Sequence, residues 1–149
     1  MNDIKIVQME DHRKKHIAVL CLPGLEGFLG DIVEHLRKEY IVTTCYSKDM
    51  AELERAIKDA DLCWFEWCNE LCIEATQKIA ILAEKKVIVR LHSYEALSGY
   101  VPHVRWSCVD VLLFVAEHIK NIVVQQVPGL LNPSMNPPAM YTVPNGVKI

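Results

Sequence analysis

The segment His16-Ile-Ala-Val-Leu-Cys-Leu22 is an uninterrupted apolar run that ends at Pro23 and Gly24. Such a run is typical of a strand that is buried on both faces of a parallel sheet. The apolar period changes directly afterwards to intervals of three and four residues, at Leu29, Ile32, Val33 and Leu36. This spacing makes one stripe of a helix. The sequence therefore predicts a β-strand followed by a covering helix.

The same alternation continues along the chain. Further strands are predicted at 40–45, 62–65, 87–91, 109–115 and 140–143. Asp49 and Asn69 are predicted to cap two helices, because their side-chain oxygens can accept hydrogen bonds from free N–H groups of the first turn. The helix after Asn69 is expected to run unbroken to Lys85, and a last helix to span 117–124. Two stretches are expected to lack regular structure, an irregular segment at 92–107 and a mobile surface loop at 127–138.

Strands that alternate with helices require crossover connections, which are right-handed and pack each helix back onto a parallel sheet. The pattern therefore predicts an α/β fold with a Rossmann-like, doubly wound parallel sheet. A chain of 149 residues, 51% of them hydrophobic, is long enough for one core, so a single domain is expected over residues 16–149. Residues 1–15 are predicted to be a lead-in or an added edge strand.

Composition argues against several classes of protein. A net charge of −3 offers no basic surface for nucleic acid, and no apolar stretch approaches the roughly 20 residues that span a bilayer. The start of the sequence lacks the apolar region of a signal peptide, which predicts a cytoplasmic protein. The six cysteines are scattered through apolar segments, so reduced, buried thiols are expected. Cys68 and Cys72 would share a helix face, but no further ligand pair completes a zinc site, and neither a metal nor another cofactor is predicted.

In a doubly wound sheet, ligands bind outside the carboxyl ends of the strands. The loop 23–30 follows the first strand and opens a helix whose free N–H groups can face a diphosphate. Gly24 and Gly27 are therefore candidate residues of a donor-phosphate loop. Their spacing is not the G-x-G-x-x-G of dinucleotide-binding enzymes, and Cys45-Tyr46 ends the second strand where such enzymes have a ribose-binding acid. An NAD enzyme is disfavoured, and the alternative interpretation of the glycines is a simple tight turn.

Three further strands end in residues that can contact a ligand. Glu66 and Trp67 follow the third strand, where a carboxylate can accept hydrogen bonds from sugar hydroxyls and an indole can cover a sugar ring. His92 follows the fourth strand and Glu117 the fifth. Because parallel strands end at one edge of a sheet, we predict that these residues share that edge with Gly24. The structural alternative is an aromatic cluster under the first loop and a buried, hydrogen-bonded histidine.

Four landmarks then follow in order, Arg90-Leu-His-Ser-Tyr-Glu95, Val104-Arg-Trp106, Val109-Asp-Val-Leu-Leu-Phe-Val115 and Val143-Pro-Asn-Gly-Val147. Together they resemble the N-terminal domain of family 4 glycosyltransferases, which have the GT-B fold. The resemblance covers nearly the whole chain from His16 onward. The last landmark is the most specific, because in that family it closes the N-terminal domain and leads into the donor domain.

The resemblance implies a retaining hexosyltransferase that moves a sugar from a nucleotide-sugar donor to a carbohydrate, lipid or small-molecule acceptor. This half would hold the acceptor, and a C-terminal domain beyond the sequence would hold the donor nucleotide. The fragment is therefore expected to be inactive alone. Gly24 and Gly27 match the loop that faces the donor phosphates, and His92 matches the cleft histidine near the reacting sugar.

Acceptor binding is assigned to Glu66, Trp67 and Glu95. His92 is expected to act in the chemical step and not in folding. The chain departs from the family pattern in two places, since the first loop lacks an adjacent glycine pair and Ala116 stands where a serine often occurs. A phosphorelay receiver domain is disfavoured, because the clustered acids and the phosphorylatable aspartate that it needs are missing from the strand ends. A non-catalytic, Rossmann-like binding or interaction module stays open as the alternative.

Overall fold

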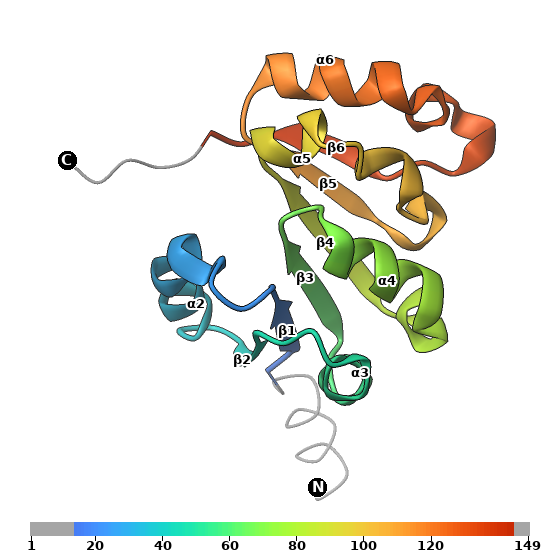
Figure 1. Cartoon of the computed structure of the whole chain (residues 1–149). Helices are drawn as coiled ribbons and strands as arrows, with labels where there is room; N and C mark the ends of the chain where they lie inside the picture. The colour runs from blue at the N-terminus through green and yellow to red at the C-terminus, as the bar shows by residue number, and fades with distance from the viewer. Residues whose placement is uncertain (1–13, 145–149) are drawn as a thin grey trace, which may run out of the picture.

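The computed structural model describes residues 14–144, which form one sheet of parallel strands covered by helices (Figure 1). The strands are β1 (His16–Leu20), β2 (Ile41–Cys45), β3 (Leu62–Glu66), β4 (Lys86–Leu91), β5 (Val111–Phe114) and β6 (Ala139–Thr142). Their order in the sheet is β2-β1-β3-β4-β5-β6. The predicted Rossmann-like α/β fold with a parallel sheet is therefore confirmed.

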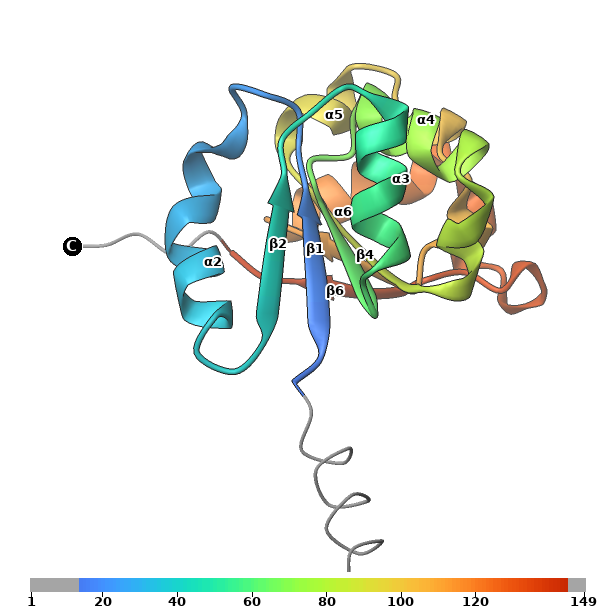
Figure 2. The same ribbon diagram turned by 90° about the horizontal axis from the view of Figure 1, so that it is seen from below.

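The connecting α-helices are α2 (Leu29–Leu36), α3 (Met50–Lys58), α4 (Glu70–Lys78), α5 (Ser93–Leu97) and α6 (Glu117–Gln126). Short 3-10 turns occur at η1 (Glu26–Phe28), η2 (Ala80–Glu84), η3 (Val101–His103), η4 (Trp106–Cys108), η5 (Pro128–Leu131) and η6 (Pro133–Met135). From β1 the chain first moves toward one side of the sheet to form β2. Every later crossover moves toward the other side, to β3, β4, β5 and β6 in turn. Right-handed crossovers then put α2 on one face of the sheet and α3 to α6 on the other, as Figure 2 shows.

Both predicted helix caps are present. A carboxylate oxygen of Asp49 accepts hydrogen bonds from the backbone N–H groups of Ala51 at 2.8 Å and Glu52 at 3.2 Å. The side-chain oxygen of Asn69 accepts one from the N–H of Leu71 at 3.2 Å. These bonds satisfy donors that have no partner within the helix, and they fix where α3 and α4 begin.

The prediction of one unbroken helix from Asn69 to Lys85 is wrong. α4 ends at Lys78, and the β-branched Ile79 is extended, with φ −95° and ψ 95°, before η2 begins. Ile79 and Leu82 are still buried, as their positions in the apolar pattern predict. The interruption therefore preserves the buried side of the segment and changes only its backbone.

The two stretches that were expected to lack regular structure contain short elements. Residues 92–107 include α5 and two 3-10 turns, so the prediction of an irregular segment is wrong in part. Residues 127–138 contain two 3-10 turns that begin at prolines, and Leu130 in the first of them is buried in the core. Short elements of this kind escape the apolar pattern because they contribute only one or two buried side chains. The predicted mobility of 127–138 stays a prediction.

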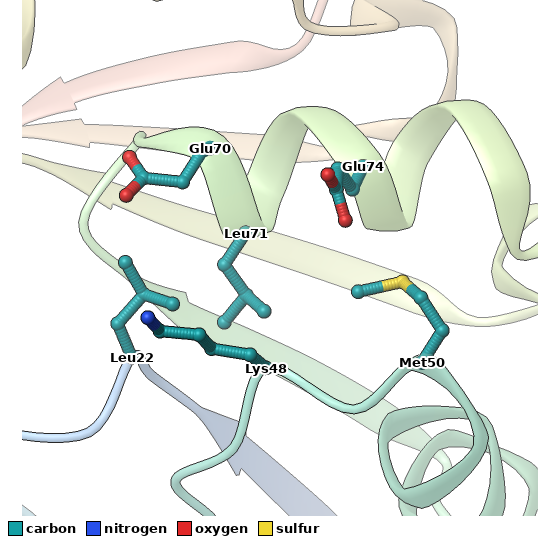
Figure 3. Close-up of a pocket in the computed structure, with 6 residues that line it drawn as sticks. All are labelled: Leu22, Lys48, Met50, Glu70, Leu71 and Glu74. Carbon is teal, nitrogen blue, oxygen red and sulfur yellow. The ribbon is translucent and has the colours of Figure 1, made fainter.

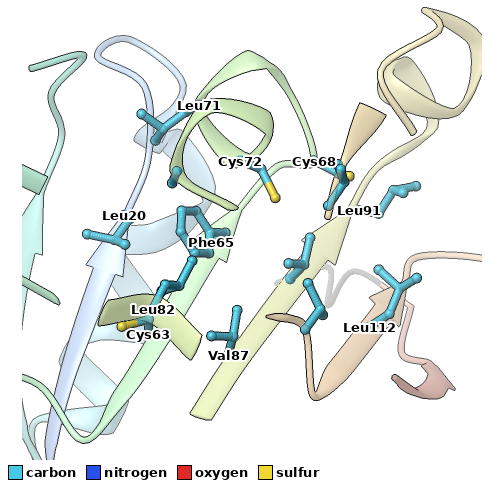
Figure 4. Close-up of a cluster of buried hydrophobic side chains, with 14 of the residues drawn as sticks. Leu20, Cys63, Phe65, Cys68, Leu71, Cys72, Leu82, Val87, Leu91 and Leu112 are labelled. Carbon is cyan, nitrogen blue, oxygen red and sulfur yellow. The ribbon is translucent and has the colours of Figure 1, made fainter. Parts of the chain in front are cut away.

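The larger core cluster lies between the sheet and α3 to α6, and Figure 4 shows part of it. Phe65, Leu20 and Leu112 are fully buried there, and each such side chain contributes about 1.5–3 kcal/mol by leaving water. A smaller cluster on the other face packs α2 against β1 and β2. The cysteines are free, and those at 21, 63, 68 and 72 are buried, as expected.

The described part of the chain contains no helix that is long and apolar enough to cross a bilayer. Two sequence predictions fall largely on residues that the structure does not describe. Residues 1–13 of the predicted lead-in and 145–147 of the Pro-Asn-Gly-Val landmark lie outside the described range.

Candidate functional site

The strand order reverses at the boundary between β1 and β3, because the chain leaves β1 in one direction and reaches β3 from the other. In open α/β sheets, the crevice outside the carboxyl ends of two such strands is the usual ligand site. Here the loop after β1 meets the residue after β3, since the indole N–H of Trp67 donates to the carbonyl of Leu25 at 2.9 Å. The candidate site is built at this junction.

Glu66 is the centre of the site. It is the last residue of β3 and is only 1% exposed. Its Oε1 lies 2.6 Å from Nε2 of His92 and 3.4 Å from a guanidinium nitrogen of Arg90, and its Oε2 accepts the indole N–H of Trp64 at 2.9 Å. Arg90 is the register partner of Glu66 on β4. Buried charges are stable only when paired and hydrogen-bonded, and Glu66 meets both conditions.

His92 follows β4 directly and is 5% exposed. The contact of 2.6 Å between its Nε2 and Oε1 of Glu66 fixes the orientation of the ring. The Trp67 ring stacks on the imidazole, with centroids 3.9 Å apart and planes at 26°. These contacts also support the fold, while the expectation that His92 acts in the chemical step and not in folding stays a prediction.

Trp67 has a backbone conformation that side chains rarely adopt, with φ of 77°. A non-glycine residue in this region costs roughly 1–3 kcal/mol and persists only where its surroundings hold it. Trp67 is held by its stack on His92 and by the bond from its indole to Leu25. Its side chain thereby joins the loop after β1 to the histidine after β4.

Glu95, which the sequence assigns to acceptor binding, is a buried carboxylate that accepts backbone hydrogen bonds. Its carboxylate is fully buried and accepts the backbone N–H groups of Cys68 at 2.7 Å and of His92 at 3.1–3.2 Å. Burial raises the pKa of Glu95, although the backbone hydrogen bonds and the nearby His92 act in the opposite direction. Glu95 thus positions His92 and the start of α4, and it presents no exposed surface to an acceptor.

The candidate phosphate loop lies beside this cluster. Gly24 has φ of +89°, a conformation that favours glycine, whereas Gly27 lies in η1 with ordinary backbone angles and open space around its Cβ position. Between them, Glu26 has a carboxylate oxygen that is buried without a hydrogen-bond partner among the described residues. The backbone of the loop therefore requires a glycine at Gly24 but not at Gly27.

Two further side chains lie close to these acids. Burial raises the pKa of the Cys21 thiol to about 12, and the charges of Glu66 and Glu26 add to the rise. The pKa of Tyr46 is also raised, first by burial and then by Cys21 and Glu26. At neutral pH both groups are uncharged, so neither offers a thiolate or phenolate nucleophile.

A small pocket of about 190 Å³ opens at the same edge of the sheet, on the side of α3 and α4 (Figure 3). Lys48 faces Glu70 and Glu74 across it, above an apolar floor that includes Leu22 and Leu71. Its polar rim suits a ligand that carries hydroxyl groups, although it is separate from the buried Glu66–His92 pair.

The prediction of a shared edge is confirmed, because Glu66 ends its strand and Gly24, His92 and Glu117 follow theirs, and all the strands are parallel. The structure brings Glu66, Trp67, His92 and Glu95 into one cluster with Gly24 and Gly27 in the adjoining loop. Glu117 does not join it. Its strand is two places from β3, and its carboxylate accepts the hydroxyl of Thr142 at 2.7 Å.

Sequence reasoning missed three participants, Trp64, Arg90 and Glu26. Arg90 has the sequence pattern of an ordinary strand residue, and only the register of β3 and β4 pairs it with Glu66. Trp64 lies two residues before Glu66 on the same strand, so the two side chains share a face, and this spacing was an available signal. Glu26 lies inside the glycine loop, and that position was an available signal. Residues 14–144 contain no cluster of three or more His, Cys, Asp or Glu side chains that could hold a metal ion.

Comparison with known proteins adds no relative to this description. A scan against protein-family models, a search of curated proteins and a search of solved structures found no match.

Proposed function

We propose that this domain is the acceptor-side half of a retaining glycosyltransferase that takes hexose from a nucleotide sugar. The observation that carries the proposal is the contact of 2.6 Å between Glu66 and His92 outside the strands where the sheet order reverses. The resemblance of the ordered landmarks to family 4 glycosyltransferases names the chemistry, and it assigns the donor nucleotide to a second domain.

Each residue then has a defined task. Glu66 and Glu95 hold His92 from two directions, so its ring has a fixed position relative to the reacting sugar. A preorganised polar group of this kind stabilises charge that develops in the transition state. Trp67 lies over His92 and supplies an aromatic surface for a sugar ring, while Gly24 lets the backbone of its loop approach the donor phosphates.

The alternative is a non-catalytic binding module, and the burial of His92 and Glu95 suits it. Both functions use the same crevice, but only the enzyme needs a second domain to close over it. We therefore expect the isolated domain to bind an acceptor saccharide weakly and to turn over no nucleotide sugar.

Binding can be tested with the three tryptophan indoles as internal probes. Trp67 lies at the candidate site, where its indole donates to Leu25, and the Trp64 indole donates to Glu66. Trp106 precedes β5 at the opposite edge of the sheet, where its indole donates to Val101. In a ¹⁵N-labelled domain titrated with a panel of mono- and disaccharides, the Trp67 indole signal should shift and the Trp106 signal should not. Equal shifts of both signals, or none with any saccharide, would count against the proposed site.

A further inference from the structure

His92 is enclosed in this structure by two of its neighbours. Its Nε2 lies 2.6 Å from Oε1 of Glu66, and the ring of Trp67 stacks on the imidazole with centroids 3.9 Å apart. Only 5% of the residue is exposed. A ligand can therefore reach the face of the imidazole that Trp67 covers only when the indole moves away.

The backbone and the side chain of Trp67 are anchored in different ways. Its backbone N–H donates to the carbonyl of Arg90 at 2.9 Å, which ties the backbone to β4. Its indole N–H donates to the carbonyl of Leu25 at 2.9 Å. The side chain is half-buried and packs at the margin of the smaller core cluster. The indole can therefore leave His92 while the backbone stays in place, provided that the bond to Leu25 breaks.

A tight turn presents the carbonyl of Leu25 to the indole. It spans Leu22 to Leu25, and the N–H of Leu25 donates to the carbonyl of Leu22 at 3.2 Å. A proline at the second position, Pro23, and a glycine with φ of +89° at the third, Gly24, are typical of a type II turn. The position of Leu25 therefore depends on a backbone angle that a glycine adopts more easily than any other residue.

Two features of this junction are typical of a part that changes its arrangement. The φ of 77° at Trp67 is rare for a residue with a side chain, and such conformations cluster at ligand clamps and switch regions. Next to Leu25, Oε2 of Glu26 is buried without a hydrogen-bond partner among residues 14–144. A buried acceptor without a partner destabilises the arrangement that buries it, and a loop that moves outward exposes this oxygen to water.

We propose that Trp67 is a gate over His92, closed in this structure and opened when the ring of a saccharide takes the place of the indole on the imidazole. Opening breaks the bond from the Trp67 indole to Leu25 and leaves the contact between Glu66 and His92 intact. The closed gate keeps water from His92 until the ligand enters, as active-site lids do. The choice of a saccharide rests on the proposed function, whereas the motion of the indole does not.

Hydrogen exchange of the indole N–H groups, followed by NMR in the full chain, tests the gate without any sugar. The Trp67 indole donates to the loop carbonyl of Leu25, whereas the Trp64 indole donates to the buried Glu66. We expect the Trp67 indole to exchange through local opening, at a rate that low concentrations of urea leave unchanged. The Trp64 indole should exchange only through unfolding of the domain, at a rate that rises with urea. Exchange of the Trp67 indole with the urea dependence of Trp64 would overturn the proposal.

Gly24→Ala and Gly27→Ala form a matched pair in the same loop. The first disfavours the positive φ of the turn that places Leu25, whereas the second adds the same methyl group where the backbone angles are ordinary and nothing lies within 4 Å. Gly24→Ala should speed exchange of the Trp67 indole by about 5- to 30-fold, and Gly27→Ala should leave the rate unchanged. Equal rates in the two variants would contradict the role of the turn in closing the gate.

Saccharide titration then tests what opens the gate. A ligand that binds only the open state binds more tightly when a larger fraction of the molecules is open. A saccharide that shifts the Trp67 indole signal should therefore bind Gly24→Ala about 5- to 30-fold more tightly than the wild type. Equal affinity would show that the ligand does not open the gate. Binding of no saccharide at all would count against the proposed function, while the exchange measurements judge the motion of Trp67 by themselves.

Discussion

Replacing His92 with alanine is the perturbation that the structure constrains most closely. The substitution removes the ring nitrogen 2.6 Å from Glu66 and leaves that carboxylate 1% exposed with one partner fewer. Loss of a hydrogen bond to a buried charged group costs about 1.5–3 kcal/mol. Loss of the stack on Trp67 adds about 0.5–1.5 kcal/mol. The domain should therefore lose about 2–4.5 kcal/mol of unfolding free energy, the sum of these contributions.

A loss of this size lowers the melting temperature by roughly 4–18 °C in a domain of this length. Differential scanning calorimetry measures the shift. His103→Ala is the matched control because His103 is exposed and its hydrogen bonds to Gln77 and Tyr100 are made by backbone atoms, which the substitution keeps. A double-mutant cycle with Glu66→Gln should show a coupling of at least about 0.5 kcal/mol. A His92→Ala shift no larger than that of His103→Ala would refute the reasoning.

Three further predictions concern the loop, a buried acid and a buried thiol. Gly24→Ala should destabilise the domain by about 1–2 kcal/mol because of its positive φ, while Gly27→Ala should be neutral or slightly stabilising; urea unfolding of both variants decides this. Because the pKa of Glu95 is raised in the folded domain, protonation of this carboxyl stabilises the fold. This contribution is complete below the ordinary pKa of 4.5 and is lost as pH rises through the raised pKa. Glu95→Gln should therefore gain stability relative to the wild type with rising pH between 4 and 8, and a constant difference would contradict it. Because the pKa of Cys21 is about 12, iodoacetamide at pH 8 should alkylate it no faster than the domain unfolds, as followed by mass spectrometry.

Much of the fold could be predicted from the sequence because strands buried on both faces of a parallel sheet consist of continuous apolar residues. His16 to Leu20 is such a run, and the apolar period of α2 begins soon after it. α5 was missed because it is five residues long and buries only Glu95 and Ala96. A helix this short, with an acid at one of its two buried positions, has no apolar periodicity that the sequence could show.

The position of the site at the carboxyl ends of the strands could be predicted, but the contacts between its side chains could not. Crossover rules place Glu66 and His92 at the same edge, and nothing in the sequence states that they bond. That contact depends on the register of β3 and β4, which also pairs Glu66 with Arg90. The hydrogen bond from the backbone N–H of Cys68 to Glu95 likewise joins residues far apart in the sequence, so the sequence alone does not show it.

Sugar transfer tests the central claim most directly. The polypeptide that carries this domain together with a donor-binding domain is supplied with radiolabelled nucleotide hexoses and a panel of acceptors, below the melting temperature of every variant. We predict transfer with retention at the anomeric carbon, reduced about 10²-fold or more by His92→Ala and unchanged by His103→Ala. Transfer that His92→Ala leaves intact, or no transfer from any nucleotide hexose, would contradict the account.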